Sequence, residues 1–219
     1  MAALLINGSP HQDGNTAWAL QAVARGLDQG GVASEVFWLG QQALGDCIAC
    51  GACQGKNPPA CVGLHDPGEE RVAAFLKQAT HYDAFVFASP VYYGHATGRL
   101  LSFMDRVFRA GGSLLQHKVA AAVAVARRAG TLATLEGIEK YFHLYQMPIA
   151  TSTYWPVTFG RTKGEASFDQ EGLATLEGLG QNIAWLVKAI KWGKQNQILP
   201  PALAPRPLTN MVRADLQNV

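Results

Sequence analysis

Residues 2–16 read AALLINGSPHQDGNT, and this stretch decides the fold class. The first six residues form a short apolar run of the kind that becomes a buried parallel strand. A Gly-Ser-Pro turn at residues 8–10 ends the run, and Asn15 and Thr16 open an amphipathic stretch that continues to about residue 29. A strand that leads through a short loop into a helix is the repeating unit of α/β sheets.

The same alternation continues along the chain. It predicts further strands at residues 32–39, 84–88, 119–126 and 147–154, and helices at 69–80, 97–109, 131–145 and 170–194. The small apolar residues of 119–126 favour a central strand that is covered on both faces. Together these elements predict an α/β fold with a doubly wound, five-stranded parallel sheet in three α/β/α layers.

Length and composition limit the classes of protein that this chain can belong to. Its 219 residues, 48% of them apolar, predict one domain over 1–195, with a cysteine-rich loop at about 41–67 and a Pro-containing tail at 196–219. A net charge of +2 gives no basis for a nucleic-acid partner. No signal peptide is expected, and no run approaches the roughly 20 apolar residues that span a bilayer. We therefore expect a cytoplasmic protein without a membrane partner.

The loop after the first strand has the composition of a phosphate site. Ligands of doubly wound sheets bind at the carboxyl ends of the strands, and the first N–H groups of a helix attract anions. Hydroxyls of Ser9 and Thr16 and the amide of Asn15 can donate to phosphate there, and Gly14 allows close approach. The loop matches neither G-x-G-x-x-G nor the Walker A pattern, so a monophosphate is predicted. An ordinary loop with an Asn or Thr helix cap is the alternative.

Three stretches of the chain together resemble a known family. NGSPHQDGNTA from Asn7, ASPVYYG from Ala88 and TYWPVTFGRTKGEASFDQEG from Thr153 are similar to the NADPH-dependent FMN reductase group of flavodoxin-like proteins, and to its iron–sulfur flavoprotein branch. The similarity covers about residues 1–190. It implies a flavodoxin-like fold and an FMN phosphate bound by Ser9, Asn15, Thr16 and Ala17. His11 stands where the family usually has Arg, so its phosphate contact is expected to be weaker and pH-dependent, or absent.

Two further loops are expected to face the flavin ring. In the family the loop after the third strand, here Pro90, Val91, Tyr92, Tyr93 and Gly94, lines the flavin, although an isolated tyrosine pair could simply pack against the next helix. The resemblance also places the loop after the fourth strand, with Arg127, Arg128 and Gly130, at the pyrimidine end of the ring. A cation there could stabilise the charge that appears on reduction or attract NADPH phosphates, and two solvated arginines are the alternative.

All four cysteines lie in one predicted loop. Cys47, Cys50, Cys53 and Cys61 have the spacing C-x2-C-x2-C-x7-C, whose first three positions resemble a [4Fe–4S] half-motif. Ferredoxins usually place the fourth cysteine three residues on, but the iron–sulfur flavoproteins allow the longer gap. A structural zinc site, reversibly oxidised thiols and unligated cysteines are the other interpretations.

The sequence thus predicts an enzyme whose chemistry resides on FMN, with no catalytic side chain. NAD(P)H would be the electron donor and a quinone, flavin or other small molecule the acceptor. The alternatives are an electron carrier with FMN and a [4Fe–4S] cluster that accepts electrons from ferredoxin, and a metal-stabilised binding protein. The resemblance implies homodimers or homotetramers with flavin sites near subunit boundaries. Asp105 and Arg106 resemble a family position of structural use and are left outside the site.

Overall fold

A computed structural model describes residues 1–202, so residues 203–219 of the predicted tail lie outside the described part of the chain. Its parallel strands follow one another in the order β2-β1-β3-β5-β6 across the sheet. Their bounds are β1 Ala2–Asn7, β2 Ala33–Trp38, β3 Ala84–Tyr92, β5 Val119–Ala126 and β6 Val157–Phe159. This is the doubly wound order of flavodoxin-like proteins, in which the direction of winding reverses between β1 and β3.

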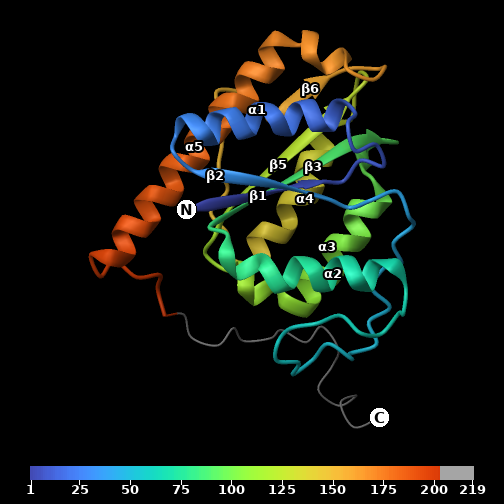
Figure 1. The fold of residues 1–219 in the computed structure, drawn as a ribbon, viewed down its shortest axis with the longest axis vertical. Coiled ribbons are helices and arrows are strands. Elements are labelled where there is room, and N and C mark those ends of the chain that lie inside the picture. Colours follow the sequence, from blue (N-terminus) through green and yellow to red (C-terminus); the bar gives the residue numbers. More distant parts are fainter. Residues whose placement is uncertain (203–219) are drawn as a thin grey trace, which may run out of the picture.

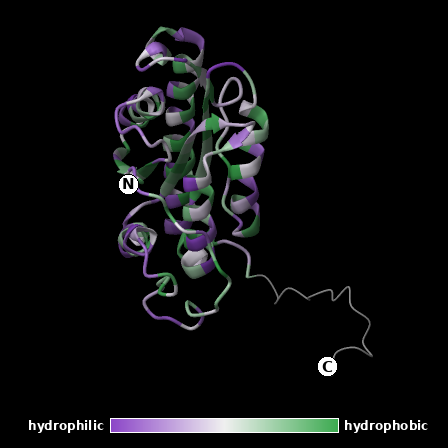
Figure 2. Ribbon diagram, turned by 90° about the vertical axis from the view of Figure 1, so that its right-hand side faces the viewer, coloured by the Kyte–Doolittle hydropathy of each residue, from purple (hydrophilic) through white to green (hydrophobic). Residues whose placement is uncertain are grey.

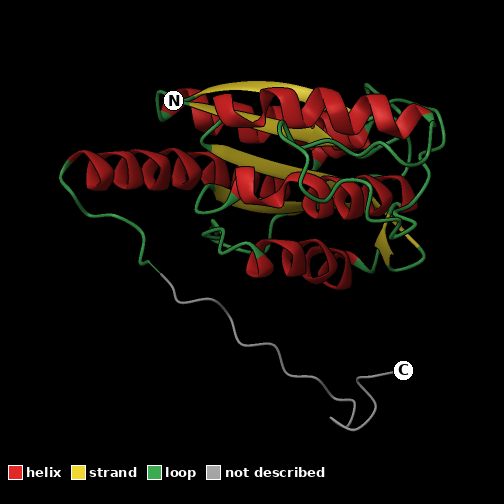
Figure 3. Ribbon diagram, turned by 90° about the horizontal axis from the view of Figure 1, so that it is seen from below, coloured by secondary structure: helices red, strands yellow, loops and turns green. Residues whose placement is uncertain are grey.

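Helices cover both faces of the sheet, as predicted (Figures 1 and 3). Helices α1 (Asn15–Gln29) and α5 (Gln170–Gln195) pack on one face, and α2 (Pro67–Gln78), α3 (Gly98–Gly111) and α4 (Thr131–Leu144) pack on the other. Short 3-10 turns occupy Ala79–His81, Gly112–Leu115 and Glu165–Phe168. Strand side chains alternate between two buried clusters, with Leu4 and Phe85 toward α2 and α3, and Leu5 and Val86 toward α1 and α5. Apolar segments accordingly gather between the helical layers (Figure 2).

The expectation for the fourth parallel strand is confirmed. Every residue of β5 is buried, and β5 pairs with β3 on one side and β6 on the other. Small side chains at these positions let helices approach from both faces of the sheet.

The prediction of a fifth strand at residues 147–154 was wrong. Only Ile149 bridges to Ala120 there, and the regular strand comes later, at β6. Between the pairs Ala120↔Ile149 and Ala124↔Val157, β5 advances four residues while the partner segment advances eight. The additional residues loop out and carry the exposed Tyr154 and Trp155. The sequence pattern of a strand does not reveal such an insertion, because Ile149 and the residues of β6 each pair with β5 in a normal parallel register.

The segment after the third strand is also more ordered than the predicted loop. Strand β3 continues to Tyr92, turns at Tyr93 and Gly94, and pairs antiparallel with β4 (His95–Ala96). Both turn residues have positive φ angles, 51° and 83°, as in a two-residue type I′ hairpin. The hairpin extends the sheet beyond its carboxyl edge, beside the loop that follows β1.

Candidate functional site

The loop after β1 is shaped by buried polar contacts. The Gly8 N–H donates to Ala88 O at 2.9 Å, and the Thr97 hydroxyl donates to Gly8 O at 3.0 Å. Asn7 is fully buried, where its amide oxygen accepts from the Ser9 N–H at 3.0 Å and its amide nitrogen donates to Gln12 O at 3.3 Å. Asn7 therefore holds the loop open, a role that its position at the end of an apolar run did not reveal.

The N-terminus of α1 faces this loop with free donors. Gly14 is the N-cap, and neither a side-chain cap nor an acidic residue is found in the first turn. Among the described residues, the N–H groups of Asn15 and Thr16 have no hydrogen-bond partner, whereas the Ala17 N–H donates to Gly14 O at 3.0 Å. Unpaired N–H groups at the positive end of a helix dipole form an anion site. The alternative of an ordinary Asn or Thr cap is not what the structure shows.

A cleft of about 510 Å³ opens at this edge of the sheet. That volume lies within the usual range for a small-molecule or cofactor site. The loop after β1, the end of β3, the end of β5 and the loop after β6 surround it. Its lining residues are Ser9, His11, Asp13, Gly14, Asn15, Thr16, Pro90, Val91, Tyr92, Val125, Arg127, Gly160, Arg161 and Lys163.

Basic side chains outnumber acidic ones around the cleft. His11, Arg127, Arg161 and Lys163 line it together with a single carboxylate, that of Asp13. Lys163 forms an ion pair with Asp13, and this hydrogen bond and charge lower the pKa of the Asp13 carboxyl. A cleft with this charge balance and unpaired N–H groups favours an anionic ligand. The contribution of Arg161 and Lys163 was missed, although both lie in a stretch that carries the family resemblance.

The side chain of Asn15 has a different role from the one predicted. Its amide nitrogen donates to Thr162 O at 2.9 Å, and its amide oxygen accepts from the N–H groups of Gly164 at 3.0 Å and Ala166 at 3.2 Å. The side chain therefore fastens the loop after β6 to the start of α1, and only the backbone N–H of Asn15 remains free for a phosphate.

The structure separates the two tyrosines of the hairpin. Pro90, Val91 and Tyr92 line the cleft, whereas Tyr93 is fully exposed and is not among the lining residues. Gly94 packs instead against Gly130, where an added Cβ on Gly130 would lie 2.8 Å from the Gly94 Cα. The hairpin and the loop after β5 thus meet at two glycines beside the cleft.

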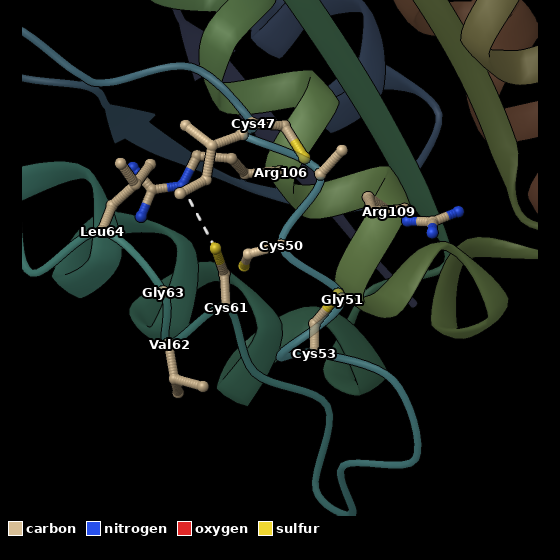
Figure 4. Close-up of a pocket in the computed structure, with 12 residues that line it drawn as sticks. Cys47, Cys50, Gly51, Cys53, Cys61, Val62, Gly63, Leu64, Arg106 and Arg109 are labelled. Atoms are coloured by element: carbon tan, nitrogen blue, oxygen red, sulfur yellow. Dashed lines mark hydrogen bonds between the residues drawn. The ribbon is translucent and has the colours of Figure 1, made fainter.

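A second, smaller cavity lies against α3 and is lined by all four cysteines (Figure 4). The four thiols are free, and within residues 1–202 no three His, Cys, Asp or Glu side chains are already arranged to hold a metal ion. The loop is nevertheless built closely around its sulfurs. A Cβ on Gly63 would lie 2.5 Å from the Cys50 Sγ.

Arg106 joins this cavity from helix α3, which the sequence did not indicate. Its side chain is completely buried, and its Nε donates to the Cys61 Sγ at 3.3 Å (Figure 4). Its Nη1 donates to Asp66 Oδ1 at 2.7 Å and to Gly45 O at 3.1 Å. Burial opposes ionisation of Asp66, but hydrogen bonds from the Gly45 N–H and from Arg106 outweigh it and lower the pKa of that carboxyl.

The residue types that line this cavity are those expected around an iron–sulfur cluster. Four thiols and one buried guanidinium surround it, and Arg106 Nη2 is buried without a hydrogen-bond partner among the described residues. Thiolates are the usual ligands of such clusters, and buried donors normally have an acceptor. The cysteine side chains would have to move toward one another to bind a cluster, because within residues 1–202 they are not arranged as metal ligands.

Comparisons with known proteins agree with this geometry. Residues 1–162 match the model of the NADPH-dependent FMN reductase family. The chain is 31% identical over 200 residues to an iron–sulfur flavoprotein of Methanocaldococcus jannaschii. The aligned region covers 87% of this chain and all of the relative.

Solved structures show the same fold at low sequence identity. RosB, with a bound formylriboflavin phosphate intermediate, has a TM-score of 0.63 at 12% identity and covers all of this chain and 96% of its own. A flavodoxin, WrbA-like protein of Agrobacterium tumefaciens has a TM-score of 0.56 at 16% identity and covers 86% of this chain and 96% of its own. These structures agree with the strand order, and the family match together with the 31% identical relative places the chain in the NADPH-dependent FMN reductase family, as a flavoprotein of the iron–sulfur flavoprotein branch.

Proposed function

We propose that the protein is an FMN-dependent oxidoreductase that passes electrons from NAD(P)H to a quinone, a flavin or another small acceptor. The observation that carries this proposal is the cleft at the reversal point between β1 and β3, where free helix N–H groups and basic side chains converge. Ligands of doubly wound sheets bind at that point. No helix within residues 1–202 is both long and apolar enough to cross a membrane.

Different residues of the cleft would bind different parts of FMN. The N–H groups of Asn15 and Thr16 and the hydroxyls of Ser9 and Thr16 would hold the phosphate, with His11 beside them. Pro90, Val91 and Tyr92 would form the wall along the ring, and Gly94 and Gly130 would fix the two loops against each other. Arg127 would place a cation at the ring's polar edge.

Bound FMN would supply the hydride and electron transfer chemistry, for which protein side chains are poorly suited. The protein would orient the ring, exclude water from one of its faces and leave the other face open to the donor and the acceptor. No side chain then needs to act as a general acid or base, and we assign none.

The cysteine cavity favours a second component of the same function. We propose that Cys47, Cys50, Cys53 and Cys61 hold a [4Fe–4S] cluster, which would add one-electron transfer and allow the protein to accept electrons from ferredoxin. The supporting observation is that all four thiols share one cavity with the buried Arg106. Anaerobic purification with iron, sulfide, zinc and FMN quantified per chain tests this. Zinc without sulfide, or no metal, would contradict the cluster.

Thr16→Asp tests the flavin site. A carboxylate beside the phosphate should weaken FMN binding by roughly two orders of magnitude, about 3 kcal/mol, because like charges repel at a site that offers N–H donors to an anion. FMN per chain after gel filtration, and bleaching of the flavin absorbance by NADPH, are the measurements. Thr16→Ser keeps the hydroxyl and should retain FMN. Normal FMN occupancy in the aspartate variant would overturn the placement.

A further inference from the structure

We propose that Arg106 is the buried cation that sets the reduction potential of the four-cysteine site, through its charge and its N–H···S hydrogen bond to Cys61. This inference rests on the proposed cluster and names the residue that would tune it. Arg106 contacts a ligand rather than the cluster, so it is a positioning residue.

The contacts of Arg106 fix one edge of its guanidinium to the cysteine loop. Nη1 binds Gly45 O, at the start of the loop, and Asp66, at its end, while Nε reaches Cys61. Asp66 also accepts from the Gly45 N–H at 2.7 Å and from the Glu69 N–H at 3.1 Å, as the N-cap of α2. Gly68 leaves the space for the guanidinium, because a Cβ there would lie 2.3 Å from Nη1. The cation therefore has a prepared position.

The hydrogen bonds around Arg106 are incomplete without an acceptor in the cavity. Its side chain is fully buried, Asp66 is the one carboxylate that contacts it in the described residues, and Nη2 has no partner there. Burying a donor without an acceptor costs roughly 1–3 kcal/mol, and more when the group is charged. Thiolates are negatively charged acceptors, so the cysteine ligands of a cluster would offer this cation the partner that it lacks.

The charge of Arg106 predicts the direction of its effect on the potential. An iron–sulfur cluster on four thiolates becomes more negative when it gains an electron. A buried cation and hydrogen bonds to sulfur both stabilise the more negative form, so they raise the reduction potential. Removing Arg106 should therefore make the cluster harder to reduce.

Arg109 provides a matched control on the same helix. It lines the same cavity one turn along α3, but its side chain is exposed and makes no hydrogen bond to a cysteine in residues 1–202. Solvent screens an exposed charge much more than a buried one. Arg109→Gln therefore removes the same formal charge from the same cavity without removing the buried contact.

The experiment measures cluster potentials in the full-length protein, purified anaerobically, by EPR-monitored redox titration. Arg106→Gln should lower the equilibrium constant for cluster reduction at least tenfold, which is 59 mV for a one-electron couple. Arg106→Lys keeps the charge but loses the Nε donor and should lie between Arg106→Gln and wild type. Arg109→Gln should stay within about twofold of wild type. FMN content should not change, because Arg106 does not line the flavin cleft.

Each outcome decides the proposal. Equal potentials for Arg106→Gln and Arg109→Gln would overturn the role of Arg106 and leave the cluster standing. Wild-type protein that contains FMN but neither iron nor sulfide would instead refute the cluster and Arg106's role with it. Arg106→Gln could keep FMN but bind no cluster, and the potential of Arg106→Lys then tests the proposal. A cluster potential below that of wild type in Arg106→Lys supports the proposal. A potential equal to that of Arg109→Gln overturns it.

Discussion

At the scale of single residues, Tyr93 combines two unusual properties. Its φ angle is 51°, a left-handed conformation that costs most residues about 1–2 kcal/mol, and its side chain is fully exposed beside the proposed flavin cleft. Tyrosine is not a residue that hairpin turns of this type favour, since Asn and Gly adopt positive φ more readily. Backbone strain of this kind tends to gather at functional sites, so the exposed ring is a candidate contact for the incoming donor or acceptor.

We predict that Tyr93→Asn stabilises the protein. Asn tolerates the left-handed conformation, and the exposed tyrosine ring gives up no buried contact, so the free energy of unfolding should rise by about 1 kcal/mol. Thermal and urea unfolding measure this, and Tyr93→Phe should leave the stability unchanged. An asparagine variant no more stable than wild type would show that the turn imposes no strain.

Tyr82 gives a prediction about alkaline pH. Burial raises the pKa of its hydroxyl to about 12, helped by the hydrogen bond that it donates to Glu35 Oε2 at 2.6 Å. Because the pKa is raised above its unfolded value near 10, this contribution to stability is complete below pH 10 and is lost as the pH rises toward 12. Tyr82→Phe should therefore show a shallower loss of stability over that interval, measured by urea unfolding at several pH values. Parallel curves for the two proteins would contradict the assignment.

At the scale of elements, the cysteine loop between β2 and α2 depends on tertiary contacts rather than on local structure. It contains no helix or strand from residue 41 to residue 66, as predicted, and Arg106 and Asp66 tie its two ends together. Loops of this length without secondary structure are uncommon in compact domains unless they serve a function.

Gly63→Ala tests how closely that loop fits its sulfurs. The new methyl group would lie 2.5 Å from the Cys50 Sγ, too close for both atoms to keep their places. Iron and sulfide per chain should fall to less than half of wild type under identical reconstitution, while FMN content stays the same. Gly55→Ala is the control in the same loop, because it restricts the backbone at φ 68° but meets nothing within 4 Å. Equal iron loading in the two variants would argue against a close fit.

At the level of the whole molecule, the edge of the sheet near the proposed flavin cleft carries exposed aromatic side chains. Tyr154, Trp155 and Phe159 are 56%, 51% and 40% exposed, on β6 and the insertion before it. Gly160, the next residue, lines the cleft. Clustered apolar side chains beside a short edge strand are typical of subunit contacts. We propose that the expected homodimer or homotetramer forms here, which would place flavin sites near subunit boundaries.

Trp155→Glu should therefore dissociate the oligomer. A charge in an apolar interface opposes association, and sedimentation velocity should show a shift toward the monomer of 23.5 kDa. Trp185→Glu removes a tryptophan that is 66% exposed on α5 and should leave the assembly intact. If Trp185→Glu dissociates the oligomer and Trp155→Glu does not, the interface lies on α5 instead.

The layered α/β architecture and the position of the loop after β1 could be predicted from the sequence. Buried strands show as apolar runs, helix starts and ends are marked by local residues, and AALLIN followed by GSPHQDGNT joins both signals within 15 residues. Each of these features depends on neighbours along the chain. The composition of the loop predicts only that the ligand carries a monophosphate. The identification of that ligand as FMN came from the family resemblance.

The features that join distant segments could not be predicted from the sequence and became visible in the folded chain. Asn15 contacts Thr162, and Arg106 contacts Cys61, across 147 and 45 residues of sequence. The split fifth strand likewise depends on its register against β5. A side chain with hydrogen-bonding groups can serve a ligand or a neighbouring loop equally well, and its sequence context does not distinguish them. The role of such a side chain depends on which donor or acceptor atom the fold brings within about 3 Å of it.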